Sequence, residues 1–198
     1  MKKLIIGTFL LITFAFLSGC GSRNITRVNS NETIDLSGRW NDTDSRLVSE
    51  EMVADLLTAP WPAKYTKDTG KRPVIVVGLI ENKSHEHINS ETFIKDIEKA
   101  VIRDGNIRLV VAGEKRNELR KERAEQQDYS APETIKKWGR ELGADFILQG
   151  TINSIVDSYK KQKVVMYQID LQLTNIETNE VVWMGDKKIK KQIKDRVL

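Results

Sequence analysis

The chain begins with one long apolar run, after which short apolar and polar segments alternate. Residues 4–17 are almost wholly apolar, follow Lys2 and Lys3, and end in Ser18-Gly19-Cys20. A positive segment, an apolar core and small residues before a cleavage point are typical of a secretory signal peptide. Because a stable membrane-spanning helix takes about 20 apolar residues, this run is too short to be one. The sequence therefore predicts export, with residues 1–19 removed.

A polar stretch follows the leader and contains few large apolar side chains. Residues 20–36 are mostly Ser, Asn, Thr, Arg and Gly. Such a composition buries too little apolar surface to fold alone. We therefore expect residues 20–36 to be a flexible tether and residues 37–198 to form one globular domain.

In the first half of that domain, the spacing of apolar residues predicts helices and strands in turn. Helical spacing over residues 45–57, stopped by Pro60-Trp61-Pro62, indicates the first helix. The continuous β-branched run at 73–80 predicts a strand covered on both faces. Similar signals predict a helix ending near residue 104, a strand at 107–112, a solvated helix at 114–127 and a helix at 130–143.

The last third of the chain predicts strands. A strand is expected at 145–156, and in residues 163–175 apolar and polar side chains alternate strictly. This period of two is typical of a strand with one wet face. A polar turn then leads into Val181-Val182-Trp183, which predicts a hairpin. The residues expected to face the core are Val165, Tyr167, Ile169, Leu171 and Leu173.

The order of these elements predicts the fold class. A crossover can join the first two strands in parallel, and an antiparallel meander can follow. We therefore expect an α/β (α+β) fold, a mixed β-sheet flanked by helices.

The single cysteine of the chain stands at the predicted cleavage point. Leu17-Ser18-Gly19-Cys20 resembles the bacterial lipobox, in which the cysteine thiol is diacylated and becomes the new N-terminus. Cys20 is thus the predicted lipid attachment site, with an ordinary leader and an incidental cysteine as the alternative. By resemblance to enteric lipoproteins, an aspartate at position 21 would favour the inner membrane. Gly21 stands there instead, which favours the outer membrane, facing the periplasm, in a host with two membranes.

Charge and motifs exclude several functions. Of 32 basic residues against 28 acidic ones, Lys2 and Lys3 lie in the leader, so the mature chain is near neutral and does not predict nucleic-acid binding. No phosphate-binding loop and no nucleophile elbow is present. His85-Glu86-His87, with Glu81 nearby, resembles a metal cluster, but catalytic zinc takes three protein ligands and the chain has no third histidine.

The remaining charged segments have structural interpretations. We interpret the His-containing segment as a solvated loop and residues 187–194 as an exposed strand face or tail. The sequence therefore predicts a protein that is not an enzyme, with no catalytic residues, no metal and no cofactor.

Two stretches resemble a known family. Residues 37–48, read as Ser-Gly-Arg-Trp-Asn-Asp-Thr-Asp-Ser-Arg-Leu-Val and running on to Pro60-Trp61, look like the opening of the LpoB-like family. Residues 175–183 resemble its closing hairpin. The resemblance covers the chain from about Leu36 and implies a fold similar to the N-terminal domain of TolB. It also implies an outer-membrane lipoprotein that binds and activates a bifunctional class A penicillin-binding protein.

The chain departs from the family pattern in its tether. The enteric member has a long proline-rich tether, whereas here about 16 residues separate Cys20 from Ser37. Fully extended, they reach only about 50–60 Å. The family's partner-binding surface has no motif that can be matched here, so the partner-binding residues are unknown at this stage.

Two alternatives to synthase activation remain open. One is a non-catalytic lipoprotein adaptor of another envelope assembly or secretion complex, distantly similar to CsgG. A pore-forming member would need membrane hairpins of roughly ten alternating residues per strand, and the chain has no spare segments for them. The other alternative, a hydrolase, is disfavoured by the missing nucleophile and base.

Overall fold

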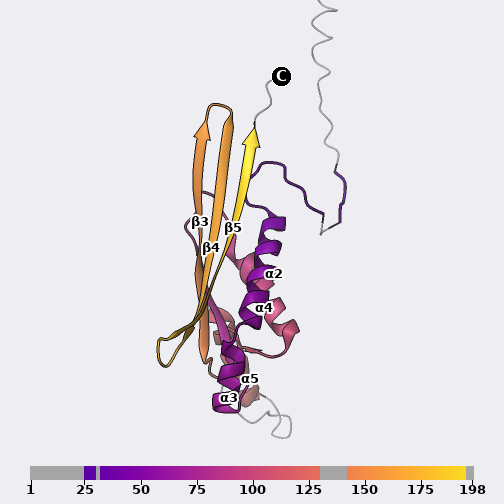
Figure 1. Cartoon of the computed structure of the whole chain (residues 1–198). Coiled ribbons are helices and arrows are strands. Elements are labelled where there is room, and N and C mark those ends of the chain that lie inside the picture. The colour runs from indigo at the N-terminus through magenta and orange to yellow at the C-terminus, as the bar shows by residue number, and fades with distance from the viewer. Residues whose placement is uncertain (1–24, 30–31, 130–141, 195–198) are drawn as a thin grey trace, which may run out of the picture. The chain divides into compact units, whose positions relative to one another are not determined.

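The computed structural model describes residues 25–29, 32–129 and 142–194 (Figure 1). The chain divides into two units, Met1–Glu32 and Thr33–Leu198, and every helix and strand described here belongs to the second. The elements are α2 (Asp42–Thr58), α3 (Trp61–Thr69), β1 (Val74–Asn82), α4 (Ser90–Asp104), β2 (Arg108–Leu109), α5 (Gly113–Tyr129), β3 (Phe146–Tyr159), β4 (Gln162–Asn175) and β5 (Val181–Lys194).

Helix α2 begins three residues earlier than the apolar spacing predicts. The side chain of Asn41 accepts a hydrogen bond from the Asp44 amide at 3.0 Å, and the Asp44 carboxylate accepts one from the Asn41 amide at 2.9 Å. This reciprocal capping satisfies two backbone donors that a helix start otherwise leaves without partners. The cap, and not the first apolar residue, therefore sets the start of the helix.

Helix α3 corrects the expectation that Pro60-Trp61-Pro62 only stops a helix. These residues do end α2, but α3 starts at Trp61, with Pro62 in its first turn. Proline is tolerated there because first-turn amides have no partner inside the helix. Trp61 is buried, and its indole nitrogen donates to the Leu56 carbonyl at 2.9 Å, which holds the corner between the two helices.

The five strands form one mixed sheet in the order β2-β1-β3-β4-β5. β1 is parallel to β2 and to β3, whereas β3, β4 and β5 run antiparallel in sequence. The predicted α+β architecture is therefore confirmed. β2 is only two residues long, shorter than the predicted 107–112, and nearly all of the helix expected at 130–143 lies outside the described residues.

Helices α2 and α4 lie side by side on one face of the sheet (Figure 1). The predicted register of β4 is confirmed, since Val165, Tyr167, Ile169, Leu171 and Leu173 are all buried. They pack with the inward side chains of the two helices and of the neighbouring strands. Among these are Val48, Met52, Leu56, Phe93, Ile97, Val101, Leu148 and Ile152.

A leucine in this core lies between two glycines. Leu171 pairs with Gly150 on β3 and with Gly185 on β5. A Cβ on Gly150 would lie 2.5 Å from Leu171 Cδ2, so the leucine side chain fills the space that the glycine leaves. The glycines have no side chains that could move into a cavity at this position.

We expect Leu171→Ala to lower the free energy of unfolding by about 2–5 kcal/mol, because neither flanking glycine can fill the void. Chemical denaturation followed by tryptophan fluorescence measures this loss. Gln172→Ala, the next residue on the half-exposed face of β4, is the control and should change stability by about 0.5 kcal/mol or less. Equal effects of the two substitutions would contradict the register.

Candidate functional site

The segment before α2 folds onto the sheet at the end where the β3–β4 turn lies. We call residues 33–41 the entry segment. Gly38 adopts a left-handed backbone (φ 68°), and a Cβ there would lie 2.4 Å from Ile193 Cγ1. Position 38 therefore requires glycine both for its conformation and for its contact with β5. The Ser-Gly-Arg-Trp stretch is explained as packing against the sheet.

A largely covered lysine on β5 binds the entry segment to the start of α2. Lys191 Nζ lies 2.6 Å from Asp44 Oδ2 and 2.8 Å from Asp35 Oδ1, and it also donates to the Arg39 carbonyl. The Lys191 and Asp44 side chains are only 12% and 6% exposed. Folded contacts therefore reach back to Asp35, inside the stretch predicted as tether.

The same ion pairs shift two pKa values. Burial of the Lys191 ammonium favours its neutral form, but the hydrogen bonds to Asp35 and Asp44 outweigh burial and raise the pKa of Lys191. The hydrogen bond from Lys191 to Asp35 lowers the pKa of that carboxyl. Both groups are thus held in their charged forms around neutral pH.

A second buried contact joins the entry segment to the loop after β1. The fully buried Tyr167 donates its hydroxyl to Glu86 Oε1 at 2.8 Å, and the Trp40 amide donates to Glu86 Oε2 at 3.1 Å. The Trp40 and Tyr167 rings meet edge to face, with their centroids 5.5 Å apart. Burial and the Glu86 carboxylate raise the pKa of the Tyr167 hydroxyl, which therefore stays a proton donor.

These contacts give Glu86 a structural role. His85 and His87 are exposed, whereas the half-buried Glu86 side chain reaches inward to Tyr167. His85 Nδ1 lies 3.0 Å from Ser154 Oγ on β3. Within the described residues no three His, Cys, Asp or Glu side chains are placed to hold a metal ion. The segment is a loop, as the sequence predicts.

The sheet face opposite α2 and α4 has a shallow hollow of about 340 Å³. Leu79 on β1 and Met184 on β5 border it and are 67% and 69% exposed. Between them lie the polar side chains of Gln149, Thr151 and Gln172, and the acidic Glu81 and Asp170 also line the hollow. An exposed apolar pair beside polar groups is typical of a protein-binding surface. We call this surface the open face.

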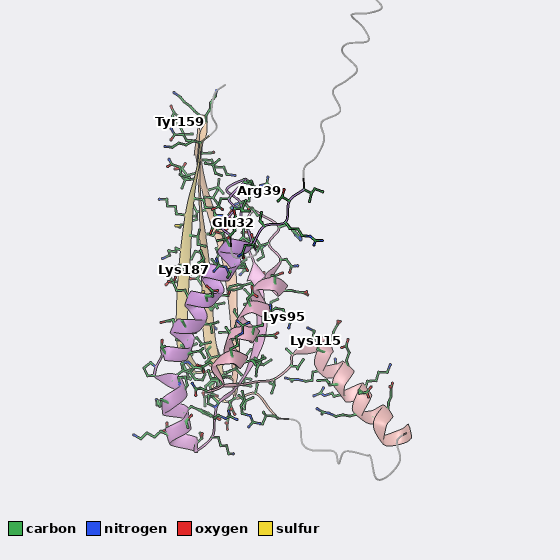
Figure 2. All side chains as sticks on the ribbon, turned by 90° about the vertical axis from the view of Figure 1, so that its right-hand side faces the viewer. Glu32, Arg39, Lys95, Lys115, Tyr159 and Lys187 are labelled. Carbon is green, nitrogen blue, oxygen red and sulfur yellow. The ribbon has the colours of Figure 1, made fainter. Side chains whose placement is uncertain are left out.

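A second hollow, of about 570 Å³, lies where the β3–β4 turn meets the entry segment. It is lined by Arg39, Lys160, Lys161 and Lys163 together with serines, Gln162 and Ile193, and none of the described residues that line it is acidic. Figure 2 shows Tyr159 at the tip of this hairpin and Arg39 below it on the entry segment. The arrangement concentrates positive charge at one end of the sheet.

Sequence reasoning missed Lys191 and Glu86, because each is part of a segment that looks solvated. A signal for Lys191 exists in every second residue from 187 to 193, where lysine and isoleucine alternate on one side of the strand. Ile189 and Ile193 pack against the core, so a lysine between them must lie on the same face and needs an acidic partner.

The predicted lipid site, Cys20, lies outside the described residues, and its modification stays a prediction. None of the described helices combines the length and the apolarity that crossing a membrane requires.

Comparisons with known proteins give a family match. A family model described as peptidoglycan-synthase activator LpoB matches residues 44–189. Among curated proteins no sequence matches.

Solved structures with a similar fold include two LpoB domains. The LpoB C-terminal domain of Escherichia coli has a TM-score of 0.42 and 17% identity. The match covers 77% of this chain and 99% of the Escherichia coli domain. The LpoB C-terminal domain of Salmonella enterica has a TM-score of 0.36 and 16% identity. That match covers 66% of this chain and 93% of the Salmonella domain. A lipoprotein of Neisseria meningitidis has a TM-score of 0.38 and 15% identity. The match covers 61% of this chain and 83% of the lipoprotein's chain.

Proposed function

Because the chain belongs to the peptidoglycan-synthase activator LpoB family, we propose that it is an envelope lipoprotein that binds and activates a bifunctional class A penicillin-binding protein. The observation that carries this proposal is the family match over residues 44–189, which runs from the first turn of α2 into β5. In this proposal the protein regulates a synthase and has no turnover of its own. The predicted lipid on Cys20 holds it at the outer membrane, facing the periplasm.

An activator of this kind works by differential binding. It raises the rate of its partner only if it binds the active conformation of the enzyme more tightly than the inactive one. A tenfold shift in the population needs a difference of about 1.4 kcal/mol, which a modest interface can supply. The protein therefore needs a surface with a few well-placed anchors and does not need a deep pocket.

The open face is the proposed contact surface for the synthase. Leu79 and Met184 expose most of their side chains on a rigid sheet, so little conformational entropy of the backbone is lost on binding. The side chains of Gln149, Thr151 and Gln172 can hydrogen-bond to a partner, and Glu81 and Asp170, which also line the hollow, add charge to its polar border. These properties suit an apolar centre with a polar rim.

The short tether adds a geometric condition to the proposal. With a reach of about 50–60 Å from the anchor, the synthase must extend toward the membrane that holds the lipid, or the periplasm must be narrow.

The activation test uses the chain without its leader and with Cys20→Ser, added to each class A synthase of the same organism. We expect binding and a several-fold increase in glycan-strand formation or cross-linking over time. The double variant Leu79→Ser/Met184→Ser should lose about tenfold in affinity, because each anchor contributes about 1 kcal/mol or more. No binding and no rate change with any synthase would contradict the proposed function.

A matched control separates the surface from the function. Ile102 on α4 is 63% exposed and lies on a helix that covers the other face of the sheet. Ile102→Ser should leave activation unchanged, because it removes an equally exposed apolar side chain outside the open face. Activation that survives in the double variant would reject the open face as the contact surface while leaving the activator function intact.

A further inference from the structure

We propose that the basic end of the sheet docks on the anionic phospholipid headgroups of the membrane that holds the lipid anchor. We define the basic end as the β3–β4 turn with the cations next to it: Arg39, Lys160, Lys161, Lys163, Lys190 and Lys194. None of the six forms an ion pair with an acid in the part of the chain that the structure describes. Among the described residues of β3, β4 and their turn at this end, the acidic one is Asp157 on β3.

The register of the strands brings these cations together. Gln162 on β4 pairs with Lys194 and Met166 pairs with Lys190, so the far end of β5 lies beside the β3–β4 turn. The hollow between turn and entry segment adds Arg39 to the group. Lys191 lies nearby but already pairs with Asp35 and Asp44, so we do not count its charge among those that can bind a lipid headgroup.

Exposed apolar side chains accompany the cations. Tyr159 is 73% exposed at the end of β3, and Ile155 is 62% exposed on the same strand. In Figure 1 the β3–β4 hairpin extends past the ends of α2 and α4, so no described helix covers it. Tyrosine favours the interface between membrane and water, where its ring is shielded and its hydroxyl remains hydrated. Cations with an adjacent tyrosine fit an anionic lipid surface better than an acidic protein groove.

The entry segment joins the domain at the basic end. Gly38 packs on Ile193 and Asp35 binds Lys191, so the chain that leads to Cys20 enters the domain at this end of the sheet. The β4–β5 turn at the opposite end contains Glu177 and Glu180 and no cation. The charge of the sheet is therefore sorted along its strands, with the positive end beside the tether.

Charge and anchor act together in this arrangement. Each lysine near an anionic surface strengthens binding by about fivefold, and salt screens the attraction. Lipid alone fixes the protein to the membrane but leaves the domain free to tumble. Contact through the basic end would orient the domain, with the β4–β5 turn directed away from the lipid. This inference does not depend on synthase activation.

The test uses the chain without its leader and with Cys20→Ser, so that no lipid is attached. The entire described core lies within Thr33–Leu198, and removal of the leader leaves it complete. We expect the protein to co-sediment at about 0.1 M salt with vesicles of phosphatidylglycerol and phosphatidylethanolamine, and not with vesicles of phosphatidylcholine alone. The triple variant Lys160→Gln/Lys161→Gln/Lys163→Gln should bind the anionic vesicles about 100-fold more weakly.

The control removes the same charge from the opposite end. Lys64 and Lys67 lie on α3, and Lys71 follows it; all three are exposed. Helix α3 packs against Phe146, the first residue of β3, whereas Tyr159 is its last. Lys64→Gln/Lys67→Gln/Lys71→Gln should therefore keep nearly full vesicle binding. Equal losses in the two triple variants, no binding to anionic vesicles, or equal binding to neutral ones would each overturn the proposal.

A direct reading of orientation completes the test. The Cys20→Ser chain contains no other cysteine, so a single new one can carry an environment-sensitive dye. With Ser158→Cys near the end of β3, beside the β3–β4 turn, the emission should shift to the blue on addition of anionic vesicles. With Thr178→Cys in the β4–β5 turn, it should not shift. A shift at position 178 alone would reverse the proposed orientation and reject it.

Discussion

Replacing Cys20 with alanine is expected to abolish lipid attachment and to release the protein from the membrane fraction. The thioether to the lipid needs a sulfur atom, and the chain has a single cysteine to provide it. Stable anchoring takes more than one acyl chain, which the diacylated cysteine supplies. Labelling with a fatty-acid analogue and fractionation of the envelope measure both effects.

The fractionation needs raised salt, because the basic end can hold an unlipidated chain weakly at low salt. Screening reduces the Debye length from about 10 Å at 0.1 M salt to about 3 Å at 1 M, which weakens that second contact but not the lipid anchor. Ser22→Ala, a change beyond the lipobox, is the control and should keep the label. Fatty-acid label on the Cys20→Ala protein would show that the lipid is carried elsewhere.

The sequence predicts the sheet well where burial differs between its faces. On β4 a slip of one residue would bury Gln168 and Asp170 in place of Tyr167 and Ile169, and such a slip is costly. The alternation therefore determines which face meets α2 and α4. The helix predicted at 114–127 also forms, as α5, in which Lys121 and Glu125 pair one helical turn apart.

The sequence is less informative where a contact joins segments that are far apart. Pro60 and Pro62 predict a helix stop, but the position of Trp61 against Phe146 depends on how β3 is placed in the sheet. In the same way, Glu86 looks like a loop residue, and only its bond to Tyr167, 81 positions away, shows that it is part of the fold. Local patterns cannot specify such pairs.

In the candidate site, too, local patterns are visible in the sequence, whereas contacts between distant segments are not. The positive charge of residues 187–194 is plain in the sequence, and the structure confirms that they form a strand, but Lys191 lies on its inner side and is only 12% exposed. Which of these lysines are available is decided by partners elsewhere in the chain. Lys187 contacts Glu51 on α2, and Lys191 binds Asp35 and Asp44, whereas Lys190 points away from the core. The division into structural and available cations is a property of the folded sheet.

Lys191→Met is expected to lower the free energy of unfolding by about 3–5 kcal/mol, the range for removing one partner of a buried ion pair. Methionine keeps most of the length of the side chain but leaves the Asp44 carboxylate, only 6% exposed, without its cation. It also removes the ion pair that joins Asp35 of the entry segment to β5. Urea denaturation followed by tryptophan fluorescence measures the loss.

Lys188→Met is the matched control. This lysine is three residues earlier on β5, and its partner Asp186 is about half exposed, as is Lys188 itself, so its loss should cost less than about 1 kcal/mol. Equal effects of the two substitutions would contradict a structural role for the Lys191 cluster. The control also preserves the number of charges removed, so that a change in net charge cannot explain the difference.

The dependence on pH gives the Lys191 cluster a signature of its own. Because the folded pKa of Asp35 is below its usual 3.8, its contribution to stability is present above that value and is lost as the pH falls through the folded pKa. Because the folded pKa of Lys191 is above its usual 10.5, its contribution is present below that value and is lost as the pH rises through the folded pKa. The difference in stability between the unmodified protein and Lys191→Met should therefore be largest near neutral pH and shrink at both extremes. A difference that is constant with pH would mean that the lysine stabilises the domain by packing alone.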